Sequence, residues 1–236
     1  MPNRPEAVRR LLGKIGKPTE LRVCYEAGPT GYALYWQLTA MGIACEVIAP
    51  SLAPAKPGDR VKTDRRDAER LASSYQAGTL TPVWVPDPKH EALRDLVRAR
   101  EAAKQDTKRA KHRLGKYLLR YGQRPASGCR AWTAVWWQWV RKLELQHPEQ
   151  NTTLLELILE VDHQSQRVER FDGAIDRAVA VAPEQLRAIV AALQALRGVA
   201  QETAVTVALE FGSFTRFELL RRTSDDVTRG RITRAA

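Results

Sequence analysis

The sequence is poor in cysteine and has no long apolar run. Its three cysteines, Cys24, Cys45 and Cys129, are odd in number and widely spaced, which excludes a disulfide scaffold and favours buried thiols in a reducing compartment. No apolar run approaches the roughly 20 residues that span a bilayer, and the first residues lack the apolar stretch of a signal peptide. These absences predict a cytoplasmic protein.

Acidic residues are also scarce relative to basic ones. The 236 residues include 38 Lys and Arg against 27 Asp and Glu, which gives a formal net charge of +11. This excess predicts an anionic partner, and nucleic acid is favoured over membrane because no basic amphipathic anchor is visible. A nucleic-acid partner would make the protein nucleoid-associated. The alternative is that Lys and Arg form solvated faces without any partner.

Apolar periodicity and turn residues divide the first part of the chain into short elements. The pattern predicts a helix over 5–15, a strand over 21–26, a helix over 32–41 and a strand over 43–49. Thr63 or Asp64 can cap a further helix, which Gly78 would end. The strand–helix–strand order is typical of a parallel α/β unit, in which ligands gather at the carboxyl ends of the strands.

Proline is absent from residues 89–122, where eight residues, most of them apolar or small, recur at alternating spacings of four and three. The residues at these spacings are Leu96, Arg100, Ala103, Thr107, Ala110, Leu114, Tyr117 and Tyr121. So narrow a seam predicts a long helix that pairs in a coiled coil, and with it a homo-oligomer. The alternative is a single long helix packed on its own domain. Further helices are predicted over 151–181, 184–197 and 201–211.

Four tryptophans lie within eight positions at Trp132, Trp136, Trp137 and Trp139. Such a cluster could form a platform on which bases stack. A helix-packing core is the interpretation that we favour, because large aromatic side chains usually bury their surface in this way.

Most of the positive charge lies on the long predicted helix. Ten basic residues stand against two acidic ones between Arg98 and Arg124. Two neighbouring helical faces carry Lys104, Lys108, Lys111 and Arg109, Arg113, Lys116, Arg120, respectively. Like charges at this spacing repel one another in an isolated helix, so contact with a phosphate backbone is their natural use, and binding should depend steeply on salt.

Three acidic residues suit a different chemistry. Asp64 and Asp67 lie on one face of a predicted first turn, and Glu26 ends a predicted strand. Carboxylates from separate elements are what a nuclease with two Mg²⁺ (or Mn²⁺) ions needs. Basic residues around the aspartates would hold a phosphate strand: Arg60, Lys62, Arg65 and Arg66. The alternative is that Asp64 caps the helix while Asp67 forms a surface ion pair with Arg70 or Arg66.

Several ordered runs together resemble one known family. They are YEAGPTGY (25–32), VIAPSL (47–52), KPGDRVKTDRRDA (56–68), VWVP (83–86) and EALRDLVRAR (91–100). The chain is similar over this stretch to the DEDD transposase family of insertion sequence one-ten. A weaker resemblance continues at LRGVA (196–200) and EFGSFTRF (210–217), which look like the start of that family's C-terminal domain.

The resemblance implies an N-terminal RuvC-like (ribonuclease H-like) domain, a coiled-coil helix pair and a C-terminal domain with a nucleophilic serine. By position, Glu26 matches the family's glutamate, and Asp64 and Asp67 match its last two aspartates. It also implies excision and insertion of a mobile DNA element, with element and target DNA and a structured guide RNA as partners.

The sequence departs from the family at both ends. The strand that carries the family's first aspartate is not found upstream of YEAG. Ser224 is the best positional match for the nucleophile, but it follows Phe217 closely and no glycine comes after it. The run GRITRA (230–235) resembles the segment downstream of the family's serine, which suggests an internal deletion. These departures predict a shortened and catalytically impaired copy.

The resulting prediction has three domains. Residues 1–88 form an incomplete α/β RuvC-like domain, 89–182 form long coiled-coil helices with a basic nucleic-acid-binding region, and 183–236 form a small all-α domain. The predicted function is that of a DNA transposase or recombinase. The alternatives are a non-catalytic nucleic-acid-binding protein and an inhibitory partner of full-length transposases.

Overall fold

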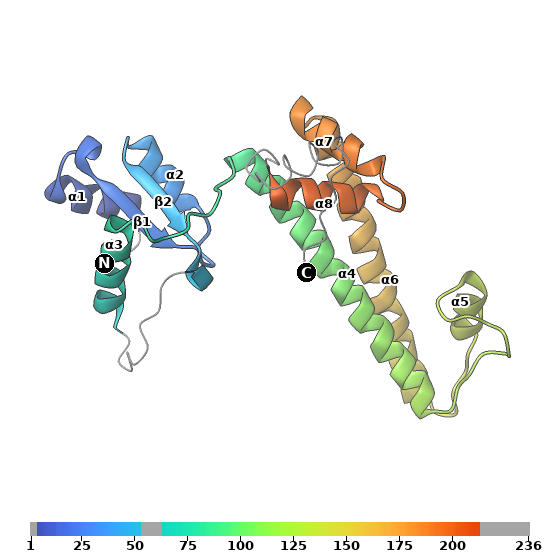
Figure 1. Cartoon of the computed structure of the whole chain (residues 1–236). Helices are drawn as coiled ribbons and strands as arrows, with labels where there is room; N and C mark the ends of the chain where they lie inside the picture. The colour runs from blue at the N-terminus through green and yellow to red at the C-terminus, as the bar shows by residue number, and fades with distance from the viewer. Residues whose placement is uncertain (1–3, 53–62, 213–236) are drawn as a thin grey trace, which may run out of the picture. The chain divides into compact units, whose positions relative to one another are not determined.

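The computed structural model describes residues 4–52 and 63–212. The chain divides into two compact units at the Val85–Pro86 boundary, and each unit is described by itself. The structure is mostly helical with one small sheet (Figure 1). Among the described residues, no helix is both long and apolar enough to cross a membrane. The further division predicted between residues 182 and 183 remains a prediction.

The first unit contains the predicted parallel strand–helix–strand arrangement. Its elements are α1 (Pro5–Ile15), η1 (Pro18–Glu20), β1 (Arg22–Glu26), α2 (Ala33–Ala40), β2 (Ala44–Ile48), η2 (Pro50–Leu52) and α3 (Asp64–Gln76). β1 pairs with β2 in parallel, with Glu26 opposite Ile48. Gly78 has φ +68° just after α3, in the left-handed region that glycine adopts without strain. The α/β prediction is confirmed at this level.

The core of the first unit lies between α1, α2 and the start of β2. Val8, Leu38 and Ile43 are buried together there. On its other side, β2 is flanked by an extended segment: the Ala49 amide donates to the Thr81 carbonyl at 3.1 Å, and the Val83 amide donates to Val47 at 2.7 Å. Within the described residues the sheet has two strands.

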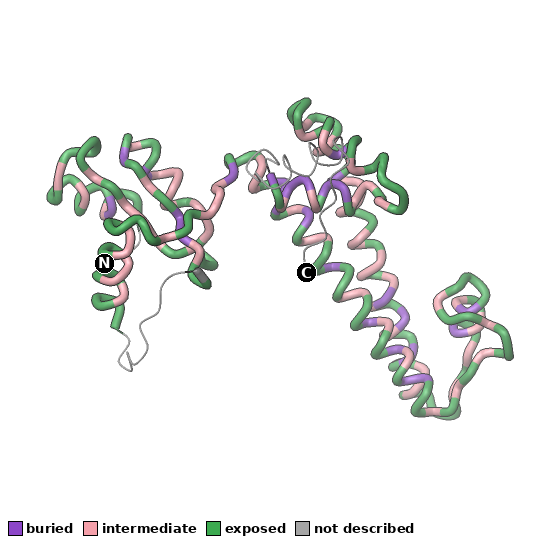
Figure 2. The backbone as a smooth tube through the Cα atoms, viewed as in Figure 1, coloured by how far each residue is buried: buried purple, intermediate pink, exposed green. Residues whose placement is uncertain are grey.

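The second unit is built on two antiparallel 33-residue helices, α4 (Pro88–Arg120) and α6 (Pro148–Ala180). Shorter helices complete it: α5 (Ala134–Arg141), α7 (Glu184–Gln194) and α8 (Gln201–Phe211). Asp87 caps α4, because its carboxylate accepts hydrogen bonds from the Lys89 and His90 amides at 2.9 Å. Buried residues follow the facing sides of α4 and α6 and continue into α8 (Figure 2).

The predicted seam on α4 packs against α6 of the same chain. Ala103 and Leu114 are fully buried, and Ala110 is 1% exposed. The Tyr117 hydroxyl donates to the Gln150 carbonyl at 2.8 Å across the two helices. The small residues let the helices approach closely. The seam is therefore filled within the chain, as in the alternative interpretation, and it no longer supports a homo-oligomer.

We expect Leu114→Ala to lower the free energy of unfolding by about 2–5 kcal/mol, because it leaves a cavity in this fully buried seam. Chemical denaturation followed by circular dichroism measures the change. Leu119→Ala, on the same helix but 56% exposed, is the matched control and should stay within about 0.5 kcal/mol of the parent. Equal losses in the two variants would contradict the packing described.

A cluster of ion pairs fastens α8 to the start of α4. Glu210 accepts hydrogen bonds from Arg94 at 2.9 Å and from Arg98 at 2.8 Å. The His90 Nε2 lies 2.8 Å from the Leu209 carbonyl oxygen. Hydrogen bonds from Arg98, together with the charge of Arg94, lower the pKa of Glu210 from 4.5 to about 2. The folded state therefore holds this carboxylate ionised.

This shift predicts a pH dependence of stability. Because the folded pKa lies below 4.5, the Glu210 contacts stabilise the fold above that pH and lose their effect as the pH falls toward about 2. Near pH 7, Glu210→Gln should lower the free energy of unfolding by on the order of 1 kcal/mol. The effect should be no larger, since the carboxylate is 37% exposed and solvent screens its ion pairs. The gap to the parent should close in acid. Glu184→Gln is the control, and a gap for Glu210→Gln that does not vary with pH would refute the assignment.

Candidate nucleic-acid interface

The predicted carboxylates lie at the ends of two elements in the first unit. Glu26 is the last residue of β1, and Asp64 and Asp67 lie in the first turn of α3. Thr63 caps that helix, since its hydroxyl accepts a hydrogen bond from the Arg66 amide at 3.4 Å. The sequence alone is compatible with either Thr63 or Asp64 as the cap, and the structure selects Thr63.

The structure does not bring these carboxylates into one ligand set. Across residues 4–52 and 63–212, no group of three His, Cys, Asp or Glu side chains could hold a metal ion. Asp67 instead forms a partly exposed ion pair with Arg70 at 3.2 Å, as the alternative interpretation predicts. The donor types suit a hard divalent cation, but their placement in this structure does not fit one.

Some predicted residues have other partners or cannot be placed. Arg65 pairs with Glu69 at 3.0 Å. Arg66 is exposed and has no acidic partner among the described residues. Arg60, Lys62 and Ser224 lie outside the described residues.

The predicted cations of α4 fall into two groups in the second unit. Three of them are paired within the chain: Lys104 with Glu101 at 3.7 Å, Arg109 with Asp106, and Arg113 with Glu160. The other four have no acidic partner in the part of the chain that the structure describes: Lys108, Lys111, Lys116 and Arg120. We call these four the open cations. They leave much of the positive charge of α4 available to an anion.

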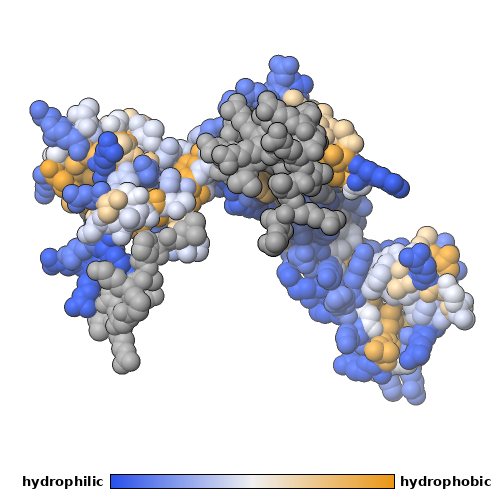
Figure 3. All heavy atoms as spheres, viewed as in Figure 1, coloured by the Kyte–Doolittle hydropathy of each residue, from blue (hydrophilic) through white to orange (hydrophobic). Residues whose placement is uncertain are grey.

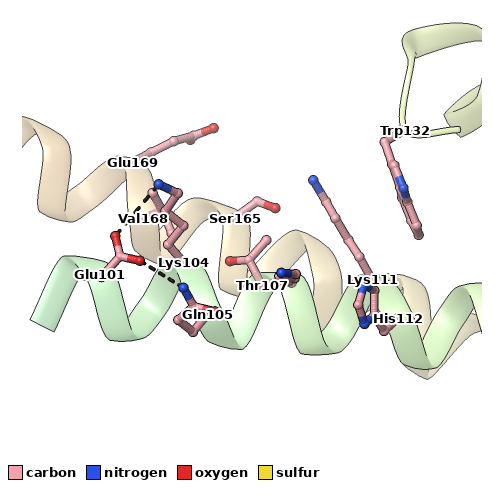
Figure 4. A pocket seen from close by; sticks show the side chains of 11 residues that line it. Glu101, Lys104, Gln105, Thr107, Lys111, His112, Trp132, Ser165, Val168 and Glu169 are labelled. Carbon is pink, nitrogen blue, oxygen red and sulfur yellow. Dashed lines mark hydrogen bonds and ion pairs between the residues drawn. The ribbon is translucent and has the colours of Figure 1, made fainter. Parts of the chain in front are cut away.

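The open cations line two hollows along α4 and α6. Lys108 and Lys111 border a hollow of about 580 Å³. Its lining also includes Trp132 and residues of α6 (Figure 4). Lys116 and Arg120 border a second hollow of about 560 Å³, with no carboxylate among its lining residues. His112 belongs to both. The visible face of this helix pair is strongly hydrophilic (Figure 3). Such a surface can accept a phosphate backbone on either side of α4.

The tryptophan cluster is mainly a packing core, as predicted. Trp136 is 4% exposed and packs with Val140, Leu154 and Ile158. Trp132 differs from the others, because it also lines the larger hollow. From the sequence, base stacking was the less favoured alternative for the cluster, and that prediction did not single out Trp132. One local signal was present: Trp132 directly precedes Thr133, the N-cap of α5, and so lies outside the helix.

Comparison with known proteins relates the chain to transposases. A family profile of DEDD transposases of insertion sequence IS110, described as "Transposase", matches residues 1–123. The chain is 43% identical over 216 residues to y4qE of Sinorhizobium fredii, named as a candidate transposase, which covers 91% of this chain and 51% of that relative. It is 31% identical over 196 residues to the transposase for insertion sequence element IS1533 of Leptospira borgpetersenii, which covers 83% of this chain and 56% of the relative.

The chain spans about half the length of these curated relatives. The profile covers more than half of the chain, including the carboxylates and all four open cations. This protein belongs to the DEDD transposase family of bacterial insertion sequence IS110.

Proposed function

We propose that the chain acts in transposition of a bacterial insertion sequence and that its open cations contact the phosphate backbone of the element's DNA. The observation that carries this proposal is the set of four cations on α4 that lack acidic partners among the described residues. Repulsion between like charges on one helix costs stability. A bound polyanion offsets that cost and releases its own counterions.

Packing of α4 supports this use of the helix. Its apolar side is fixed against α6 by buried residues, so the cations project from an ordered element. Lys108, Lys116 and Arg120 are exposed, while Lys111 is half-buried. Arg120 stacks over Tyr117 and Tyr121, with its guanidinium carbon 5.3 Å and 5.0 Å from the ring centroids. These aromatic contacts orient the guanidinium without neutralising its charge.

The triple variant Lys108→Gln, Lys111→Gln, Lys116→Gln should bind a duplex less tightly and with a weaker salt dependence. Each lost phosphate contact should reduce the slope of log affinity against log salt by about 0.9. Fluorescence anisotropy with a labelled duplex at several salt concentrations measures both quantities. The matched control is Lys14→Gln, Lys89→Gln, Lys142→Gln, which removes the same charge from exposed lysines elsewhere.

Equal effects of the two triple variants would mean that binding depends only on the net charge of the protein. That result would contradict the assignment of the α4 surface. Repeating the titration with a structured RNA transcribed from the element tests the guide-RNA partner. RNA binding that survives the loss of the three lysines would place that partner elsewhere on the chain.

We also propose that the first unit is the RuvC-like domain and takes part in DNA strand cleavage through Glu26, Asp64 and Asp67. What supports this is the resemblance of these residues to the family's motif, the family match over residues 1–123, and their position at the end of β1 and the start of α3. Mg²⁺ or Mn²⁺ is the cofactor that these donor types suit, although the three carboxylates do not form one ligand set in the described structure. The assignment of Ser224 as the nucleophile rests on the sequence motif alone.

Binding and cleavage should separate in carboxylate variants. Glu26→Gln and Asp64→Asn remove acids that do not belong to the α4 surface, so we expect their affinity for branched DNA to stay within about twofold of the parent. Cleavage of that DNA in Mg²⁺ should be lost, as it should be on chelation with EDTA. Gel electrophoresis of the labelled strands measures cleavage.

Glu69→Gln, which removes an exposed acid paired with Arg65 on α3, is the matched control and should retain cleavage. Absence of cleavage by the parent protein would favour the alternative, a non-catalytic nucleic-acid-binding protein. Unimpaired cleavage by both carboxylate variants would exclude these residues from the chemistry.

A further inference from the structure

The larger hollow on the α4–α6 pair differs in chemistry from the smaller one. Its lining residues include the carboxylates Glu101 and Glu169 as well as three lysines and Trp132. The Glu101 carboxylate forms an ion pair with the Lys104 ammonium at 3.7 Å and accepts a hydrogen bond from the Gln105 side-chain amide at 2.9 Å. A run of phosphates would meet carboxylates here, whereas the smaller hollow has none in its lining. The larger hollow therefore suits a neutral group attached to a phosphate backbone.

Trp132 offers that group an aromatic face. Figure 4 shows its indole extending from the segment before α5 toward Lys111 on α4. The Lys111 ammonium lies 5.6 Å from the ring centroid. The ring also packs in a tilted arrangement against Trp136, with centroids 4.4 Å apart. The indole is thus supported by the core and only half-buried, so part of its surface remains open to the hollow.

The backbone at Trp132 is itself unusual. Among the described residues, Trp132 is the one non-glycine residue with positive φ, at +70°. A bulky side chain rarely adopts this backbone region, because it is sterically strained there. In this conformation Trp132 lies ahead of the α5 cap rather than inside the helix, where the other three tryptophans lie.

We propose that the larger hollow binds one unpaired base of a DNA strand, stacked on Trp132, while Lys108 and Lys111 hold the adjoining phosphates. A stacked base would take the place of the Lys111 ammonium over the indole and leave that lysine free to reach a phosphate. Since bases all present a π face, such a site distinguishes single-stranded from paired DNA rather than one sequence from another. This inference rests on the proposed nucleic-acid surface, because the two share their lysines.

Trp132→Leu tests the inference, because leucine keeps apolar bulk and removes the aromatic face. We expect it to weaken binding of a single-stranded 20-mer by about 5- to 150-fold, the range typical for loss of one stacked base. Binding of the corresponding duplex should change less than about twofold. The salt slope should stay that of the parent, since stacking releases no phosphate counterions. Trp132→Phe should recover most of the affinity.

Trp139→Leu is the matched control, because Trp139 packs on the same core but does not line the hollow. Thermal melting of each variant establishes that it is folded. Unchanged single-strand affinity in Trp132→Leu, an equal loss for duplex and single strand, or an equal loss in Trp139→Leu would each overturn the proposal. Tighter, Trp132-dependent binding of an RNA of the same sequence would overturn the assignment to DNA.

The outcome is distinguishable from a failure of the proposed function. If duplex binding depends on the open cations while Trp132→Leu binds single strands normally, the proposed phosphate-contacting surface is supported and the proposed base-binding site is contradicted. If the parent protein binds neither duplex nor single strand, both proposals are contradicted.

Discussion

The close packing of α4 on α6 is the interaction on which the second unit depends. Ala103 and Ala110 let the two helix backbones approach, and Leu114 fills the space against the α6 residues Leu154 and Ile158. Because this side of α4 is packed against α6, the charged residues of α4 lie on the two sides of the helix next to the contact. The surface that we assign to nucleic acid is therefore a consequence of how the core is packed.

The facing helix also decides which cations stay open. Acidic residues of α6 reach α4, so that Asp172 pairs with Arg100 at 2.7 Å and Glu160 pairs with Arg113. In the opposite direction, Arg167 of α6 reaches Asp106 at 3.4 Å. The charge pattern of α4 predicted two basic faces, but it could not tell a neutralised cation from an available one. That distinction needs the partner helix, and these three ion pairs join residues 47, 61 and 72 positions apart in sequence.

Local chemistry explains what could be predicted. Turn glycines, N-caps and apolar periodicity act within a few residues, and they sufficed to predict α1, β1, β2, α3 and α8 nearly to their ends. Two features could not be predicted from the sequence, because they depend on contacts between distant parts of the chain. The seam on α4 was compatible with a second copy or with the same chain, and only the fold shows that α6 fills it. Convergence of Glu26, Asp64 and Asp67 likewise depends on how α3 lies against β1, which spacing along the chain does not determine.

The two proposed activities therefore rest on elements of very different stability. α4 carries eight buried residues, whereas α3 has none. Exposed and partly exposed pairs such as Asp67–Arg70 and Arg65–Glu69 contribute little, since ion pairs of this kind are worth about 0–1 kcal/mol. A helix with so few buried contacts opens at low free-energy cost, so a bound strand or cation can reposition Asp64 and Asp67 without disrupting a core. The proposed phosphate-binding surface needs no such adjustment, because packing against α6 already orders it. On this proposal, affinity for nucleic acid does not depend on how the acidic residues are arranged, which is why binding and cleavage have to be measured apart.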